Sequence, residues 1–182
     1  MDLYINWSSW AAPKKFGGGK MAYKVFISHS TRDQGLVMSL SNLLWKFGAE
    51  VDVAEWYLTP AEQLDKKVFG QITNSDCVVV LLTQNGIRSN WVQQEIGYAL
   101  NAGFGKDKPL IPLVEEGIDS KDLGALQGKD YIKYDPYRPQ EALLRTSTYV
   151  NSLRLKKEEK EKTLLIAGSI IAFLLLLSGG KK

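Results

Sequence analysis

The sequence predicts an α/β protein with a five-stranded, doubly wound parallel sheet and helices on both of its faces. Five short apolar runs, the helical patterns between them and one run that is apolar almost throughout support this fold class. Strands that alternate with helices over about 130 residues are typical of parallel sheets. The predicted strands are Tyr23–Ser28, Glu50–Val53, Cys77–Thr83, Leu110–Val114 and Tyr131–Tyr134.

Each element has its own local signal. The third strand is apolar up to Thr83, as expected of a central strand that is covered on both faces. Helices are expected over 34–47, 61–73, 90–102, more weakly over 119–126, and from about 139 onwards. The first has apolar residues at helical spacing, followed by Gly48 as a C-terminal cap: Leu36, Leu40, Leu43, Leu44 and Phe47. Five strands favour the flavodoxin-like order 2-1-3-4-5, with ligands at the carboxyl ends near the first and third strands.

The composition of the chain argues against several classes of function. With 182 residues, of which 45% are hydrophobic and 24% charged, the chain suits one globular domain with appendages. Its net charge of +3 is too small to indicate nucleic-acid binding, and several of the positive charges lie at the two ends. The single cysteine, Cys77, excludes an internal disulfide framework. The single histidine, His29, argues against a His-based metal site or a Ser-His-Asp triad, so no metal is expected.

Four regions follow one another along the chain. Residues 1–20 are expected to form a flexible N-terminal arm, without the long apolar core of a signal peptide. The folded domain is expected over 21–150 and a charged stalk over 151–162. Residues 163–180 carry no charge, and we predict a single membrane-spanning helix there, with an oligomerising hydrophobic helix as the alternative. More basic residues precede this segment than follow it, which favours a domain on the cytoplasmic side of the membrane.

Hydroxyl groups and one guanidinium follow the first predicted strand. Ser28, His29, Ser30 and Arg32 could hold a phosphate or a ribose. The simpler interpretation is helix capping by Ser30 or by Asp33. His29 could be a general base or a hydrogen-bonded structural histidine.

The loop after the second strand carries two aromatic residues, Trp56 and Tyr57. These rings could stack on a base or contact a partner chain. Other proteins with sheets of this size fit less well. A receiver domain needs carboxylates where this chain has Ser28 and Thr83-Gln84, and a dinucleotide-binding dehydrogenase needs a G-x-G-x-x-G motif that is absent after the first strand.

The start of the helix predicted over 90–102 places Trp91 and Glu95 four residues apart, and so on one face. A carboxylate beside an apolar ring can stabilise a developing positive charge, as in enzymes that cleave sugars. By itself the pattern is weak, because a glutamate in a first helical turn usually just favours the helix dipole.

Two motifs together resemble the TIR (Toll/interleukin-1 receptor) domain family, and in style its prokaryotic members. Lys24–Ser30, followed by Asp33, resembles the opening strand of that family, and Ser89–Ile96 resembles its S-x-W-x-x-x-E segment. The resemblance covers roughly residues 22–150. The loop after the second strand takes the place of the family's BB loop, but Trp56–Glu62 departs from the usual acidic stretch with a glycine before the helix.

The resemblance implies an enzyme that consumes NAD as its substrate, without a cofactor, and releases nicotinamide with ADP-ribose or a cyclic variant. Such enzymes often serve antiphage defence. Glu95 corresponds to the family's catalytic glutamate and Trp91 to the aromatic residue before it. The expected substrate-binding residues are Ser28, His29, Ser30, Arg32, Trp56 and Trp91.

The resemblance also leaves a second class of function open, a non-catalytic, membrane-anchored scaffold for interactions between TIR domains. The expected partners are NAD, further copies through the TIR domain, the membrane and a downstream effector, but no nucleic acid.

Overall fold

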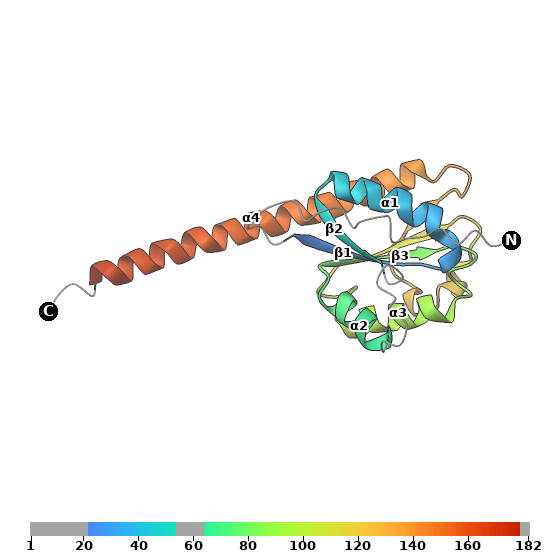
Figure 1. The fold of residues 1–182 in the computed structure, drawn as a ribbon, viewed down its shortest axis with the longest axis horizontal. Helices are drawn as coiled ribbons and strands as arrows, with labels where there is room; N and C mark the ends of the chain where they lie inside the picture. The colour runs from blue at the N-terminus through green and yellow to red at the C-terminus, as the bar shows by residue number, and fades with distance from the viewer. Residues whose placement is uncertain (1–21, 54–63, 179–182) are drawn as a thin grey trace.

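The computed structural model describes residues 22–53 and 64–178 (Figure 1). Side chains are described up to residue 169, except those of residues 64 and 65. The expected N-terminal arm over 1–20 and the loop with Trp56 lie outside the described residues.

The predicted sheet is confirmed. Its strands lie in the order β2-β1-β3-β4-β5, and every neighbouring pair is parallel. Each strand begins and ends within one residue of its prediction: β1 Tyr23–Ser28, β2 Ala49–Val53, β3 Cys77–Leu82, β4 Leu110–Glu115 and β5 Ile132–Tyr134. Because the order reverses between β1 and β3, the carboxyl ends of these two strands form the switch point of the sheet.

Helices cover both faces of the sheet (Figure 1). On one face lie α1 (Gln34–Lys46) and the first part of α4 (Gln140–Ser178). On the other lie α2 (Leu64–Thr73), α3 (Asn90–Asn101) and the 3-10 segment η4 (Ser120–Leu126). Side chains of a strand point alternately to its two faces, and in β3 they enter both cores: Cys77, Val79 and Leu81 on the α1 side and Val78, Val80 and Leu82 on the α3 side.

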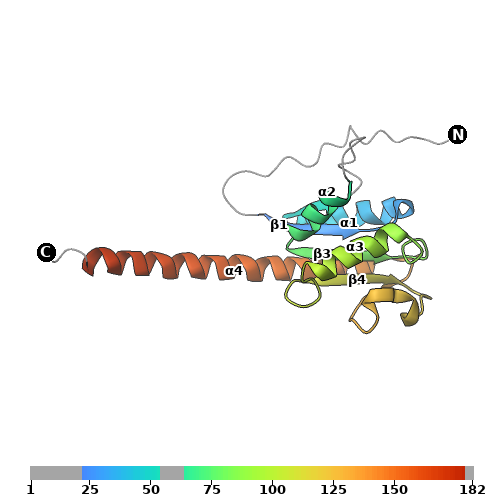
Figure 2. The ribbon, with the colours of Figure 1, turned by 90° about the horizontal axis from the view of Figure 1, so that it is seen from below.

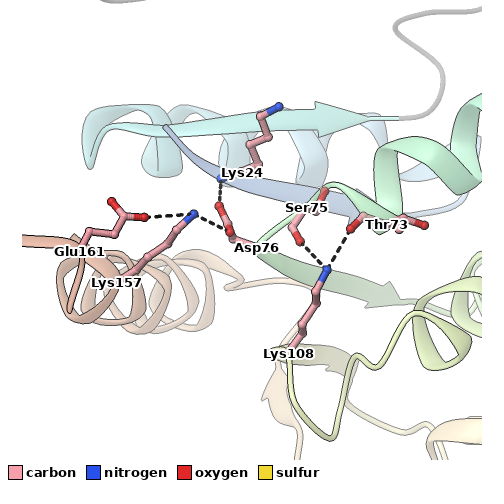
Figure 3. Close-up of polar contacts among 7 residues, drawn as sticks. All are labelled: Lys24, Thr73, Ser75, Asp76, Lys108, Lys157 and Glu161. Carbon is pink, nitrogen blue, oxygen red and sulfur yellow. Dashed lines mark hydrogen bonds and ion pairs between the residues drawn. The ribbon is translucent and has the colours of Figure 1, made fainter. Parts of the chain in front are cut away.

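Helix α4 is continuous from Gln140 to Ser178 and extends away from the sheet (Figures 1 and 2). Its first turns bury Leu143 and Val150 in the core. Further along, Lys157 Nζ donates to Asp76 Oδ1 at 2.7 Å, while Asp76 Oδ2 accepts the backbone N–H of Lys24 at 2.9 Å (Figure 3). One carboxylate therefore connects β1, the start of β3 and the charged part of α4 at the amino end of the sheet.

The predicted membrane helix is not supported. Across the part of the chain that the structure describes, no helix is long and apolar enough to cross a membrane. A crossing needs about 20 consecutive apolar residues, whereas the described side chains of the uncharged run cover only 163–169, directly after the charged run Arg154–Lys162 in the same helix. The predicted single-pass localisation, with the domain held at the membrane by residues 163–180, is therefore wrong. The last part of that segment, from 170, lies beyond the described side chains.

Removing the Asp76 carboxylate should loosen the amino end of the sheet. Asp76→Ala leaves both the Lys24 N–H and the Lys157 ammonium without this acceptor, so we expect the free energy of unfolding to fall by about 1–3 kcal/mol. Lys157→Ala breaks the partly exposed ion pair with Asp76 and the weaker contacts of Lys157 with Glu161 and the Tyr23 ring, which should together cost about 0.5–1 kcal/mol. Urea denaturation measures both. Asp76→Asn keeps an acceptor for the Lys24 N–H and should resemble Lys157→Ala. Equal losses for Asp76→Ala and Asp76→Asn would show that the backbone contact contributes nothing.

Alkaline pH should destabilise the fold through buried acids of the same region. Burial, with the nearby Cys77 and Asp76, raises the pKa of the Tyr23 phenol, and burial raises the pKa of the Cys77 thiol. A raised pKa in the folded state gives stability that is complete below the unfolded pKa values, about 8.5 for cysteine and 10 for tyrosine, and is lost as the pH rises above them. Urea midpoints should therefore fall above about pH 8.5. The decline should be shallower in Tyr23→Phe and unchanged in Tyr137→Phe, which alters a tyrosine that is 92% exposed.

Candidate active site

The switch point brings the two sequence motifs into direct contact. Ser28 is the last residue of β1, and its Oγ donates to Glu95 Oε2 of α3 at 2.5 Å, across 67 positions of sequence. Both residues are buried, with 0% of Ser28 and 2% of Glu95 exposed. A hydrogen bond this short between oxygen atoms is among the stronger ones. It fixes where the Glu95 carboxyl group lies relative to the end of β1.

Glu95 occupies a core position of its helix. The buried residues of α3 recur at helical spacing on one face, and Glu95 is one of them: Val92, Glu95, Ile96 and Ala99. The explanation that a glutamate here simply favours the helix dipole does not hold, because no acidic residue lies in the first turn of α3 and the effect falls off beyond that turn. A carboxyl group in an apolar face costs stability unless it is paired, and the Ser28 hydroxyl supplies one partner.

The rest of the second motif shapes the start of α3. Ser89 is the N-cap, and its Oγ accepts the N–H of Val92 at 3.4 Å. Trp91 is half-buried and packs against the core on the α3 side of the sheet. It lies one helical turn before Glu95, on the same face, as predicted.

The loop after β1 contains both buried and exposed residues. His29 and Ser30 are buried, at 4% and 7% exposed, whereas Arg32 is exposed. Ser30 is the N-cap of the 3-10 turn η2 (Thr31–Asp33) and accepts the N–H of Arg32 at 3.4 Å. The capping interpretation of Ser30 is therefore confirmed. The remaining predicted site residue, Trp56, lies outside the described residues.

Asp33 does not cap helix α1 with its side chain, contrary to the alternative considered from the sequence. Its carboxylate instead reaches the carboxyl end of β3. Oδ2 accepts the Thr83 hydroxyl at 2.7 Å, and Oδ1 accepts the Asn85 side-chain amide at 3.1 Å. Sequence reasoning missed Thr83 and Asn85 as partners of this loop. The available signal was a threonine and an asparagine directly after an apolar strand, facing the end of β1 across the switch point.

Thr83 also organises the loop between β3 and α3. Its Oγ1 accepts the N–H groups of Asn85 at 3.1 Å and Gly86 at 2.8 Å. The loop folds back so closely that a Cβ at Gly86 would lie 2.7 Å from the Leu81 carbonyl oxygen. This tight turn leads directly into the helix that carries Trp91 and Glu95.

A second carboxylate, at the end of β4, contacts the loop between β3 and α3. Glu115 Oε2 accepts the Gln84 N–H at 3.1 Å and the Tyr134 hydroxyl at 3.4 Å. Burial raises the pKa of the Tyr134 phenol, and the negative charges of Glu115 and Asp33 raise it further. The phenol therefore stays neutral and can donate to Glu115.

The chemistry available here is that of one buried carboxyl group with a hydroxyl donor and a neighbouring indole. Among the residues that the structure describes, no group of three or more His, Cys, Asp or Glu side chains could hold a metal ion. A fixed carboxylate in a site of low dielectric can stabilise positive charge that develops nearby.

Comparisons with known proteins agree with the motifs. A family model described as "TIR domain" matches residues 25–146. Two curated relatives are both named 2' cyclic ADP-D-ribose synthase. The one from Bacteroides thetaiotaomicron is 26% identical over 92 residues, covering 50% of this chain and 32% of the relative. The one from Acinetobacter baumannii is 25% identical over 132 residues, covering 72% of this chain and 45% of the relative. The chain thus spans less than half the length of the curated relatives that it matches.

A solved structure with a similar fold is the TIR domain of the Toll-related receptor TRR-2 from Hydra magnipapillata. It superposes with a TM-score of 0.58 at 17% sequence identity and covers 73% of this chain and 99% of that one. At this level of identity the likeness concerns the fold alone.

Gly86→Ala should destabilise the protein by about 2–3 kcal/mol, because its Cβ would meet backbone atoms of Leu81 and Thr83 that cannot move independently. Gly97→Ala is the matched control within α3, where a Cβ meets nothing within 4 Å. It should be neutral or stabilising by up to about 1 kcal/mol, as expected for alanine in a helix. Thermal unfolding monitored by circular dichroism measures both. Similar effects for the two variants would contradict the close approach at Gly86.

Proposed function

The chain belongs to the TIR domain family, and we propose that it is an enzyme that consumes NAD by cleaving the bond between nicotinamide and ribose. The products are nicotinamide and either ADP-ribose or a cyclic ADP-ribose variant. The observation that carries the proposal is the buried Glu95 carboxyl group, held by Ser28 at the switch point of the sheet. The names of the two relatives, both cyclic ADP-ribose synthases, support the same substrate.

Cleavage of this bond does not require the protein to supply a proton to the leaving group. Nicotinamide is cationic while it is attached to ribose, so the electron pair of the broken bond neutralises the ring nitrogen and no proton is needed to release it. The ribose carbon becomes electron-deficient and resembles an oxocarbenium ion. The enzyme must therefore orient the ribose and stabilise positive charge at that carbon.

Glu95 is the proposed catalytic residue for this step. Its carboxylate would accept hydrogen bonds from the ribose hydroxyls and offset the charge that develops on the ribose. The apolar surroundings strengthen such an interaction compared with water. The Ser28 hydroxyl holds the carboxylate in one orientation, so little rearrangement is needed when the charge develops.

The neighbouring side chains are proposed to bind the rest of the substrate. Trp91 would border the nicotinamide and ribose, and Trp56 would stack on a ring of NAD. The exposed guanidinium of Arg32 suits the diphosphate, and His29 and Ser30 would contact the ribose or diphosphate.

The low exposure of Glu95, 2%, means that NAD must displace neighbouring groups to reach it. We therefore propose that self-association of the TIR domain completes the site. Water attack on the ribose carbon, with loss of a proton, gives ADP-ribose. Attack by a hydroxyl group of the same nucleotide gives a cyclic product instead, which could act as a signal for a downstream effector, for example in antiphage defence.

Glu95→Gln should abolish most of the activity. The amide keeps the size and a hydrogen-bond acceptor but loses the negative charge, so we expect kcat for nicotinamide release to fall by about 10²–10³-fold. The measurement is nicotinamide release from NAD by the full chain, clustered on beads at high density, with product identification by mass spectrometry.

Two further variants make this test specific. Glu116→Gln removes an exposed carboxylate just after β4 and should leave kcat unchanged. Ser28→Ala keeps the Glu95 charge but removes its hydroxyl donor, and should lie between Glu95→Gln and the unmodified protein. Absence of nicotinamide release under enforced clustering, or equal rates with and without the Glu95 carboxylate, would favour a non-catalytic scaffold for TIR–TIR interaction.

A further inference from the structure

We infer that Asp33 is a positioning residue for Glu95. This inference deepens the proposed function, on which its catalytic part rests. Asp33 lies at the end of η2, between the end of β1 and helix α1. Its carboxylate binds Thr83 and Asn85, which follow β3, and thereby ties together the two loops that meet at the switch point.

The connection from Asp33 to Glu95 runs through consecutive short contacts. Thr83 Oγ1 donates to Asp33 and accepts the N–H groups of Asn85 and Gly86. The Ile87 N–H then bonds the Thr83 carbonyl at 3.0 Å, and the Ser89 N–H bonds the Gly86 carbonyl at 3.1 Å. Ser89 caps α3. Every turn between the Asp33 contact and the helix start is therefore hydrogen-bonded.

The loop has little freedom to adopt another path. It is pressed against β3 at Gly86, where a single added carbon would clash with the Leu81 carbonyl. The side chain of Asp33 is thus the link from the loop after β1 to a tightly folded segment that ends at the helix of Glu95. Ser28, on the same β1–α1 side, contacts Glu95 directly. Asp33 consequently holds the start of the helix that carries Glu95, while pairing of β1 with β3 holds Ser28.

A positioning role for Asp33 predicts different kinetics from a role in substrate binding. A displacement of a catalytic group by about 1 Å can cost about 10²-fold in rate without weakening substrate binding in proportion. The charge of Asp33 is not required for the link. An asparagine at this position can accept the Thr83 hydroxyl with its oxygen and donate to the Asn85 side-chain oxygen after a flip of that amide.

The test combines amide hydrogen exchange with kinetics on the full chain. In Asp33→Ala, the amides of Asn85, Gly86 and the first turn of α3 should exchange at least about tenfold faster than in the unmodified protein, whereas those of β4 should not change. In the same variant, kcat for nicotinamide release should fall by about 10²-fold with little change in KM. Asp33→Asn should restore most of both properties.

Thr83→Val removes the hydroxyl that donates to Asp33 without removing a charge, and it also removes the acceptor of the Asn85 and Gly86 N–H groups. It should reproduce the effects of Asp33→Ala, and the double variant should be no worse than either single one, as expected for residues that act as a unit. Asp122→Ala, which alters an exposed aspartate in η4, should change neither readout. If Asp33→Ala fails to fold, Asp33→Ser takes its place, because its shorter side chain carries one oxygen in place of the two that bind Thr83 and Asn85.

Each outcome has one meaning. Unchanged exchange in Asp33→Ala, or in Asp33→Ser where that variant replaces it, would overturn the positioning role whatever the result for Thr83→Val. Restored exchange in Asp33→Asn with activity as low as in Asp33→Ala would also overturn it, because the charge would then act directly on the substrate. If the unmodified protein releases no nicotinamide although exchange responds as expected, the link stands and the proposed function is what has failed.

Discussion

The burial of β3 on both faces is the constraint on which the rest of the structure depends. A strand whose side chains enter two cores can sit only in the middle of the sheet, with helices above and below it. Its polar neighbours must then lie at its two ends. Asp76 at the amino end binds β1 and α4, and Thr83 at the carboxyl end binds the loop after β1. Each end of this strand thus carries a polar link to a distant segment.

The two ends of β3 serve different purposes. At the amino end the contacts join α4 to the sheet, and Lys157 of this helix also lies over the Tyr23 ring at 5.8 Å. At the carboxyl end the contacts order the loop that leads into α3. The apolar face of that helix contains one acidic residue, Glu95. An acidic group in an apolar face reduces stability, and such conflicts between local and global preference are expected at functional sites.

The elements of the fold were largely predictable because their signals are local. Every strand begins and ends within one residue of its prediction. These predictions used the spacing of apolar residues and the polar breaks between them. The apolar C-terminal run was misinterpreted because hydrophobicity alone does not show what surrounds a segment. In the structure it continues the helix that starts on the sheet and carries the charged run, and no described helix meets the requirements of a membrane span.

The sequence by itself determined the strand–helix order and the family, since both follow from patterns and motifs along the chain, and it made Glu95 the candidate catalytic residue. Only the tertiary structure decided that Glu95 is buried against Ser28, and that Asp33 holds Thr83 and Asn85 rather than capping its own helix. These contacts join residues between 50 and 67 positions apart. They exist because the parallel sheet places the carboxyl ends of β1 and β3 side by side, a proximity that no local pattern encodes.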